Sequence, residues 1–340
     1  NNEGNPYEEF TYVFSTGNTI DSLMLDGRVV VAETGKADST LVVLLYRNAD
    51  DSAVHKRKPD FLAKVSGKGN FSFLNLPAGT FKIYALKDGD GGRTYNSKKE
   101  LFAFADTDIT VSAGTTQVLL YASAAEKENR TATTSKPPVE KKLRYALPVS
   151  YQFQDLLTPF DISFNKPLKE FDTAKLVLTD TNHKPVPATW SIDSSRKKIS
   201  LAVKWQQGMN YQLIMDTTAV SDSANTRLTK QDTIRFVTRN QEDYGNVVLR
   251  FSNLDLGKNP VLQFVQGEEV KESYPVKAME WSNKMMNPGE YEVRILYDAN
   301  QNGKWDQGDY SKKQQPEKVV TLPLKLAVKA NWDNERDIKL

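Results

Sequence analysis

The sequence contains no cysteine and only two histidines among its 340 residues. Without cysteine the chain has no disulfide framework, no thiolate zinc site and no cysteine nucleophile. The histidines, His55 and His183, stand in polar, turn-like stretches outside any serine-nucleophile or paired-histidine metal motif, which indicates exposed loop histidines. Carboxylates such as Glu268 and Glu269 are adjacent rather than opposed, so they give a glycosidase no support. We predict that the protein is not an enzyme and has neither catalytic nor cofactor-binding residues.

Long hydrophobic runs and an excess of one charge are missing as well. No stretch approaches the ~18 consecutive apolar residues that a membrane-spanning helix requires. The 45 lysines and arginines are interspersed with 43 aspartates and glutamates, which leaves a formal net charge of +2 and no basic face. We therefore predict no transmembrane segment in this chain and no nucleic-acid partner. The chain starts at Asn1 without a methionine or a signal-peptide pattern, so we expect an upstream segment that has been removed or is not included.

What the sequence does have is a recurring alternation of apolar and polar residues over short stretches. This two-residue period is typical of half-buried β-strands. Glycine, proline, asparagine and aspartate separate the stretches at short intervals, and no long helical stripe with caps interrupts them. The sequence therefore predicts an all-β chain of tandem β-sandwiches, with strands at residues such as 41–46, 71–74, 81–86, 160–164, 211–215 and 291–296.

Polar stretches divide the chain into units. Residues 123–142 are charged, threonine-rich and proline-ended, with almost nothing to bury, which predicts a linker or a solvent-exposed crossover. Softer boundaries fall at residues 17–21 and 238–244. We therefore expect a short lead at 1–17, a first sandwich at 18–122, the linker at 123–142, a middle sandwich at 143–239 and a last sandwich at 240–340.

One phrase occurs twice, once in the first sandwich and once in the last. Leu76 to Gly92 aligns without a gap with Met286 to Asn302, and the shared positions include two glycines, Gly79 and Gly289. Each glycine precedes an alternating strand that ends in an aspartate-rich turn. Self-similarity of this kind indicates an internal duplication, so we expect the two sandwiches to share one architecture.

The second copy continues with the residue spacing of a calcium-binding loop. Oxygen-bearing side chains stand at loop positions one, three, five, nine and twelve, and Gly303 stands at position six, where the chain turns sharply. Calcium takes six to eight oxygen ligands, and position seven of such a loop contributes a backbone carbonyl. The sequence therefore predicts a structural calcium ion held by Asp298, Asn300, Asn302, Lys304, Asp306 and Asp309.

The alternative is an asparagine- and aspartate-rich turn without metal. Asp309 replaces the glutamate that usually closes such a loop, and a strand rather than a helix leads into it. With three carboxylates, the expected dissociation constant is modest, about 10⁻⁴ to 10⁻³ M, as in extracellular modules. The first copy keeps Asp88 and Asp90 but has Gly92 and Lys99 at the fifth and twelfth positions, so we expect a metal-free turn there.

The middle sandwich resembles the bacterial Ig-like domains of the SbsA type. The resemblance rests on an apolar strand followed by Asn-Lys-Pro-Leu at 160–168, a Gly-x-x-Tyr turn ending at Tyr211, and a closing phrase at 234–238. The lead at 1–17 is similar to the last hairpin and closing strand of such a domain. This similarity implies that the chain begins inside a truncated Ig-like domain.

The first and last sandwiches resemble transthyretin-like, or carboxypeptidase-regulatory-like, β-sandwich domains. The first carries an opening phrase at 27–35 and the signature Gly-x-Phe, then Gly-x-Tyr or Gly-x-Phe, at 69–71 and 79–81, and the last keeps Pro-Gly-Glu-Tyr at 288–291. The alternation of Ig-like and transthyretin-like modules resembles a family of Bacteroidota envelope lipoproteins. That resemblance implies an upstream lipid anchor, an outer-membrane-associated location in the cell envelope, and other envelope or outer-membrane proteins as partners.

Two functions follow as hypotheses. The leading one is a non-enzymatic spacer and protein-interaction module, serving as an accessory subunit of an outer-membrane assembly. The alternative is a carbohydrate-binding module protein with a glycan partner, because tryptophan rings form flat platforms for sugars. Exposed coplanar tryptophans would favour this alternative and buried ones would oppose it; the chain has Trp190, Trp205, Trp281, Trp305 and Trp332.

Overall fold

The computed structural model describes residues 21–114, 117–126, 142–148 and 150–340. Nearly all regular structure in this part of the chain is β, as the alternating sequence predicted. Three hydrophobic cores lie within residues 23–122, 143–236 and 247–340. The predicted closing strand at 1–17 and most of the predicted linker at 123–142 lie outside the described residues. No helix among the described residues is long and apolar enough to cross a membrane.

The first sandwich consists of two sheets that enclose one core. One sheet has the order β4-β1-β8, in which β1 pairs antiparallel with β4 and parallel with β8. The other has the order β3-β2-β5-β6, with β7 also paired to β5. The elements are β1 (Leu23–Val31), β2 (Val42–Arg47), α1 (Ala53–Lys56), β3 (Phe61–Lys64), β4 (Asn70–Leu76), β5 (Gly79–Leu86), β6 (Phe102–Phe104), β7 (Ile109–Val111) and β8 (Val118–Ala122).

The last sandwich repeats this topology. Its sheets have the orders β22-β19-β25 and β21-β20-β23-β24, and β19 again pairs antiparallel with one neighbour and parallel with the other. The strands are β19 (Gly245–Ser252), β20 (Pro260–Gln266), β21 (Glu269–Pro275), β22 (Glu280–Met286), β23 (Gly289–Tyr297), β24 (Lys318–Val328) and β25 (Asp333–Lys339), with short 3-10 helices η2 (Gln241–Asp243), η3 (Leu256–Lys258) and η4 (Tyr310–Lys312). The duplicated phrase therefore marks a duplicated fold.

The register of the strands fixes which residues of the two copies are equivalent. The two glycines at the starts of β5 and β23 adopt nearly the same backbone angle, with φ of 153° and 158°. In the first sandwich Leu44 of β2 lies opposite Tyr84 of β5. In the last sandwich Gln263 of β20 lies opposite Arg294 of β23. One apolar and aromatic pair in the first copy thus corresponds to a polar pair in the second.

The middle sandwich has a different topology. Its sheets have the orders β10-β18-β16-β13 and β14-β15-β11-β9, with a separate ladder of β12 and β17. The elements are β9 (Tyr145–Ala146), β10 (Phe153–Gln154), β11 (Phe160–Phe164), β12 (Leu168–Phe171), η1 (Thr173–Lys175), β13 (Leu176–Asp180), β14 (Thr189–Ile192), β15 (Lys198–Ala202), β16 (Asn210–Met215), β17 (Val220–Asp222) and β18 (Asp232–Thr238).

A buried carboxylate ends strand β17 of the middle sandwich. Asp222 accepts hydrogen bonds from Lys166 Nζ at 2.8 Å and from the backbone N of Thr226 at 2.8 Å. The lysine bond, followed by the backbone bond, lowers the pKa of Asp222 to about 2. Because the folded-state pKa lies below the ordinary value of 3.8, this group stabilises the sandwich above that pH, and the contribution disappears as the pH falls toward 2.

We expect Asp222→Asn to remove this part of the acid sensitivity. The melting temperature of the variant should be lower than that of the parent at neutral pH, and the difference should shrink between pH 3.8 and 2. Thermal unfolding followed by circular dichroism over a pH series measures this change. The exposed Asp337→Asn is the matched control, and an Asp222→Asn curve parallel to the parent curve over this interval would contradict the prediction.

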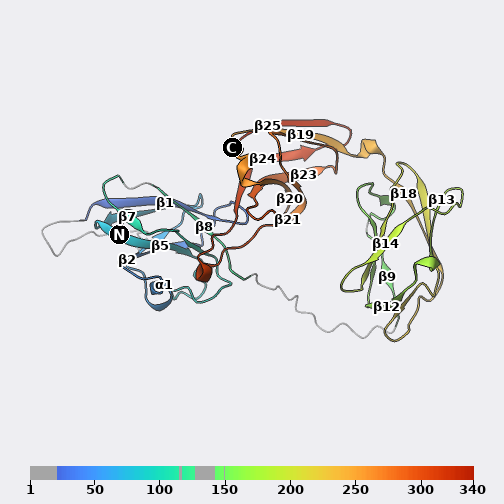
Figure 1. Ribbon diagram of the computed structural model, residues 1–340, viewed down its shortest axis with the longest axis horizontal. Coiled ribbons are helices and arrows are strands. Elements are labelled where there is room, and N and C mark those ends of the chain that lie inside the picture. The colour runs from blue at the N-terminus through green and yellow to red at the C-terminus, as the bar shows by residue number, and fades with distance from the viewer. Residues whose placement is uncertain (1–20, 115–116, 127–141, 149) are drawn as a thin grey trace, which may run out of the picture.

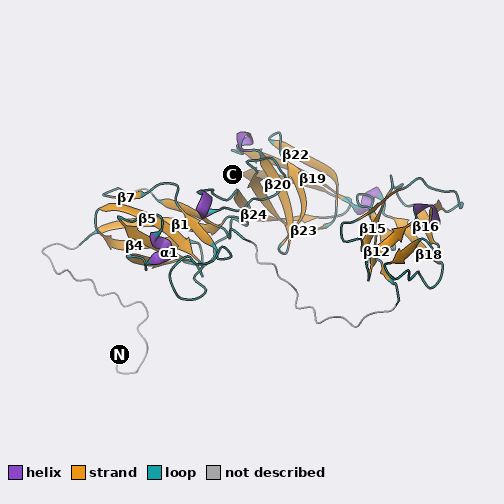
Figure 2. Cartoon of the chain, turned by 60° about the horizontal axis from the view of Figure 1, so that its bottom comes forward, coloured by secondary structure: helices purple, strands orange, loops and turns teal. Residues whose placement is uncertain are grey.

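The three sandwiches are not arranged in their chain order. Figure 1 shows the last sandwich, in orange to red, between the first, in blue to teal, and the middle one, in green to yellow. Figure 2 shows the same order after a 60° turn. The last sandwich therefore contacts both of the others, and these two contacts determine how the chain is braced.

Candidate calcium loop and its contact with the first sandwich

The candidate calcium ligands lie in the connection between β23 and β24, residues 298–317. Asp298 follows the last residue of β23 and is almost fully buried. Its carboxylate accepts hydrogen bonds from the backbone N of Asn302 at 3.2 Å and of Gly303 at 2.7 Å. Gly303 has a φ of 75°, a conformation that glycine adopts without steric cost. The first half of the loop is therefore a tight turn around the Asp298 carboxylate.

Asp306 brings two more predicted ligands together. Its Oδ2 accepts from the side-chain amides of Asn300 at 2.5 Å and Asn302 at 2.8 Å. The Oδ1 atoms of both asparagines accept from backbone N–H groups further along the turn. The structure thus gathers Asp298, Asn300, Asn302 and Asp306 in one loop. For calcium to bind, the two amides would have to turn their oxygens from these N–H groups toward the ion.

Glu317 is a residue of this loop that the sequence analysis missed. It is 9% exposed, and its carboxylate accepts from the backbone N of Ala299 at 2.8 Å and of Asp306 at 3.0 Å. Burial, with a smaller contribution from the charges of Asp298 and Asp306, raises the pKa of Glu317 above the ordinary value of 4.5. The pairing of Tyr297 with Lys318 across the hairpin brings their neighbours Asp298 and Glu317 close together, and this register has no local signal in the sequence.

The remaining two predicted ligands serve other contacts. Asp309, at the twelfth position, accepts from the backbone N and the hydroxyl of Ser311 and thereby caps η4. Lys304 donates its backbone N to Asn302 Oδ1 at 2.7 Å. Among the described residues, no three His, Cys, Asp or Glu side chains are close enough to hold a metal ion. The loop fits calcium only with ligand movement, and calcium binding stays a prediction.

The corresponding turn of the first copy has its own hydrogen bonds. Asp90 Oδ1 accepts from the backbone N of Gly92 at 2.8 Å, and Asp88 Oδ2 accepts from the backbone N of Arg93 at 3.1 Å. Asp88 Oδ1 is enclosed without a hydrogen-bond partner among the described residues. The expectation that this turn binds no metal remains a prediction.

The second half of the loop, residues 307–315, leaves the last sandwich and binds the first; we call this segment the latch. Its central residue is Tyr310, which is 7% exposed and packs against the aromatic rings of Tyr84, Phe102 and Phe104. Its hydroxyl shares a hydrogen bond of 2.9 Å with the Tyr84 hydroxyl and donates to the Asp51 carbonyl at 2.9 Å. Tyr310 therefore completes a cluster on the outer face of the sheet that contains β5 and β6.

Polar contacts surround the Tyr310 side chain. Gln315 Nε2 donates to the Phe104 carbonyl at 3.0 Å and to Asp106 Oδ1 at 2.8 Å. The backbone N of Gly308 donates to Ser123 Oγ at 3.1 Å, and Lys313 Nζ lies 2.8 Å from Asp51 Oδ2. An aromatic centre with a polar rim is the usual composition of a specific protein interface.

The edge of β24 extends the contact beyond the latch. The backbone N of Val319 donates to the Ala32 carbonyl at 3.2 Å, and Lys36 Nζ lies 2.6 Å from Glu292 Oε2. A Cβ at Gly35 would stand 2.5 Å from the Val319 carbonyl oxygen, and its φ is 66°. Only glycine allows the two backbones to approach so closely at this point.

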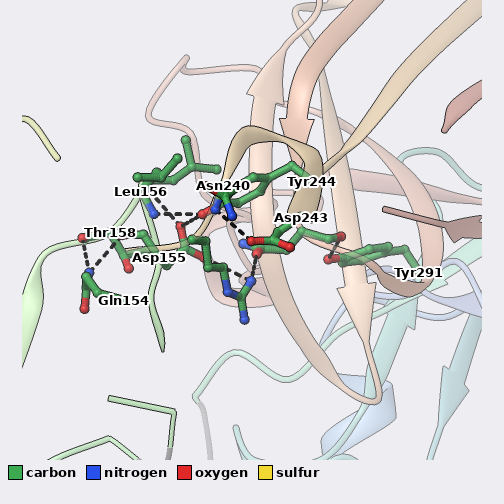
Figure 3. A network of polar contacts seen from close by, with 11 residues as sticks. Gln154, Asp155, Leu156, Thr158, Asn240, Asp243, Tyr244 and Tyr291 are labelled. Atoms are coloured by element: carbon green, nitrogen blue, oxygen red, sulfur yellow. Dashed lines mark hydrogen bonds and ion pairs between the residues drawn. The ribbon is translucent and has the colours of Figure 1, made fainter. Parts of the chain in front are cut away.

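A second joint connects the middle and last sandwiches (Figure 3). Tyr244, which precedes β19 and is 2% exposed, donates its hydroxyl hydrogen to Asp155 Oδ1 at 2.9 Å. The same hydroxyl accepts from the backbone N of Leu156 at 2.7 Å. Burial raises the pKa of Tyr244 to about 12. Arg239 Nη1 donates to Asn287 Oδ1 at 2.9 Å, so residues on both sides of the short connection contribute to the joint.

The histidines and tryptophans occupy positions that bear on the sequence hypotheses. His55 and His183 are both exposed, and His55 Nδ1 lies 2.6 Å from the Tyr95 carbonyl oxygen. Trp190, Trp205, Trp281 and Trp305 pack against hydrophobic cores, whereas Trp332 is 62% exposed. No two tryptophans are in ring contact within the described part of the chain. The coplanar platform expected for the carbohydrate-binding alternative is therefore missing from the described residues.

Comparison with known proteins gives no family for this chain. No protein-family profile and no curated protein matches the sequence. Among solved structures, the major pilin subunit BcpA of Bacillus cereus is 12% identical, with 93% of this chain and 98% of the pilin covered and a TM-score of 0.21. The major pilin SpaD of Corynebacterium diphtheriae is 9% identical, with 94% and 96% covered and a TM-score of 0.20. A part of native alpha-2-macroglobulin from Escherichia coli is 12% identical, with 56% and 91% covered and a TM-score of 0.28.

Proposed function

We propose that this chain is a non-enzymatic structural and interaction module of a bacterial cell envelope. The observation that carries this proposal is the latch, which joins two copies of one sandwich through a buried tyrosine and polar contacts around it. Interfaces between domains of one chain allow relative motion by default unless they are large and hydrophobic. A chain that closes such an interface holds its sandwiches in a defined order, which suits a brace better than a flexible string of domains.

The finer part of the proposal rests on the sequence resemblance. The chain is a lipoprotein at the outer membrane, alternates Ig-like and transthyretin-like modules, and acts as an accessory subunit of an outer-membrane assembly. A lipid anchor attaches it to the membrane, and its partners are other envelope or outer-membrane proteins.

Fractionation and cross-linking in the native host test this proposal. We expect the full-length protein in the outer-membrane fraction, and chemical cross-linking before affinity purification should recover defined envelope proteins. A variant with Tyr310→Ala, in which the latch is opened, should recover fewer of them than Trp332→Ala, which changes an exposed residue away from the latch. A cytoplasmic location, or identical partners for both variants, would contradict the proposal.

Calcium is proposed as a structural ion of the loop at Asp298, Asn300, Asn302 and Asp306. We expect a chelator to lower the melting temperature of the last sandwich, because an ion that binds only the folded loop stabilises it. Asp298→Ala should abolish the difference between chelated and calcium-loaded protein, as measured by differential scanning calorimetry. The control is Asp88→Ala in the first copy, which should keep that difference. Identical melting of the parent protein with and without chelator would contradict calcium binding.

A further inference from the structure

A cleft of about 740 Å³ opens beside the interface of the first and last sandwiches. Its base is the outer face of the sheet that contains β20 and β23, and one rim belongs to the first sandwich through Glu33, Thr34 and Lys36. Trp305 forms part of the wall and packs on Val261, Leu296 and Val319. Volumes of this size, at the border of two domains, are typical of small-molecule sites.

The duplication gives this cleft a counterpart in the first sandwich. There the equivalent face carries Leu44 and Tyr84, is buried, and is covered by Tyr310 of the latch. In the last sandwich the same positions carry Gln263 and Arg294, and no segment of the described chain fills the space above them. In the first sandwich this face is thus covered by protein, whereas in the last sandwich the equivalent face is polar and open.

The polar groups at the base have unused hydrogen-bonding capacity. Gln263 is 6% exposed and lines the cleft, and its side-chain amide makes no hydrogen bond to another described residue. Arg294 is 4% exposed and contacts Glu292 Oε1 through Nε and Nη2, both at 2.6 Å. Its Nη1 makes no hydrogen bond in the part of the chain that the structure describes. Because both residues line the open cleft, these groups are available to hydrogen-bond a ligand there.

The charges and shapes of the lining specify the ligand. Three cationic side chains line the cleft: Lys36, Arg294 and Lys304. Glu292 forms ion pairs with Lys36 and Arg294, and two further carboxylates, Glu33 and Glu268, also line the cleft. The site is therefore electrically balanced and does not favour a charged ligand. Gln263 requires a partner that both donates and accepts, Arg294 Nη1 requires an acceptor, and Trp305 offers an aromatic wall. We propose that this cleft binds a neutral saccharide, whose hydroxyl groups both donate and accept hydrogen bonds.

The first copy supplies the variants that test this site. Gln263→Leu and Arg294→Tyr install the residues that the duplicated sheet already tolerates at these positions. Titration calorimetry with a panel of neutral trisaccharides (maltotriose, cellotriose, xylotriose, mannotriose and chitotriose) should detect at least one ligand for the parent protein. Each variant should bind that trisaccharide about tenfold more weakly or worse, because each removes a hydrogen-bonding group. Trp332→Ala, far from the lining residues in sequence and exposed, should bind it like the parent.

The melting temperature without ligand separates a binding role from a structural one. If Gln263 serves the ligand rather than the fold, Gln263→Leu should melt no lower than the parent, because the substitution removes no hydrogen bond to another described residue. A lower melting temperature would mean that the amide supports the fold and would count against the proposal. It is overturned if no trisaccharide of the panel binds, if both variants bind like the parent, or if only a charged sugar such as trigalacturonic acid binds.

Discussion

Replacing Tyr310 by alanine is expected to release the first sandwich from the last. The substitution removes a ring that contacts four aromatic side chains and the His55 imidazole, and it removes a hydroxyl that bonds Tyr84 and Asp51. Truncation of a buried aromatic residue typically costs about 3–5 kcal/mol, which exceeds what the surrounding exposed ion pairs return. Small-angle X-ray scattering should show a larger radius of gyration, and calorimetry should resolve an earlier transition for the first sandwich.

Two further variants isolate the cause of this release. Tyr310→Phe keeps the ring and removes the hydroxyl, so it should cost about 1–3 kcal/mol and leave the sandwiches together in most molecules. Gly35→Val acts at the other end of the contact, where a side chain would meet the Val319 carbonyl, and should open the interface without touching the latch. An unchanged radius of gyration in both Tyr310→Ala and Gly35→Val would show that the latch does not hold the sandwiches.

The second large effect is expected at the joint of the middle and last sandwiches. Tyr244→Ala removes a ring that is 2% exposed and leaves the Asp155 carboxylate and the Leu156 backbone N without their common partner. We expect a loss of about 3–5 kcal/mol from the last sandwich and its contact with the middle one. Chemical-denaturant unfolding, followed by fluorescence, measures the change.

The matched variant at this joint is Tyr244→Phe. It retains the ring, so the packing of the last sandwich should survive while only the hydrogen bonds to the middle sandwich are lost, at about 1–3 kcal/mol. A distance reporter between the middle and last sandwiches should then broaden even though the last sandwich melts almost normally. Equal melting temperatures and equal distance distributions for Tyr244→Phe and the parent would mean that Arg239 and its neighbours hold the joint alone.

The strands and the duplication were predictable because both are local signals. Alternation in β5 and β23 follows from one buried and one exposed face, and the glycines that open them mark a backbone conformation that survives duplication. The order of the sandwiches in space was not predictable. It depends on Tyr310 meeting Tyr84, a contact between residues 226 positions apart, and no pattern within either segment refers to the other.

In the candidate calcium loop, too, the sequence predicted local contacts and not those between distant residues. Loop spacing grouped Asp298, Asn300, Asn302 and Asp306, and hydrogen bonds do connect these residues within one tight turn. It missed Glu317, which comes close to Asp298 only through the pairing of β23 with β24. It also treated Asp309 as part of the ligand set, although the 3-10 helix that presents Tyr310 uses this carboxylate as its cap. Residue spacing predicts which side chains of a loop lie close together. The hairpin register and the docking of the loop on the first sandwich determine which other residues it contacts.

The latch is synthesised much later than the surface it covers. The aromatic face around Tyr84 is complete once the first sandwich has folded, which requires the chain up to Ala122 of β8, but its cover is Tyr310, 188 residues further on. At elongation rates of about 5–20 residues per second, this interval is about 9–38 s. During that time the protein carries an uncovered apolar surface of the kind that chaperones recognise and that drives aggregation. The contact that holds the first and last sandwiches together in the finished molecule therefore leaves the first sandwich prone to aggregation until the latch has been synthesised.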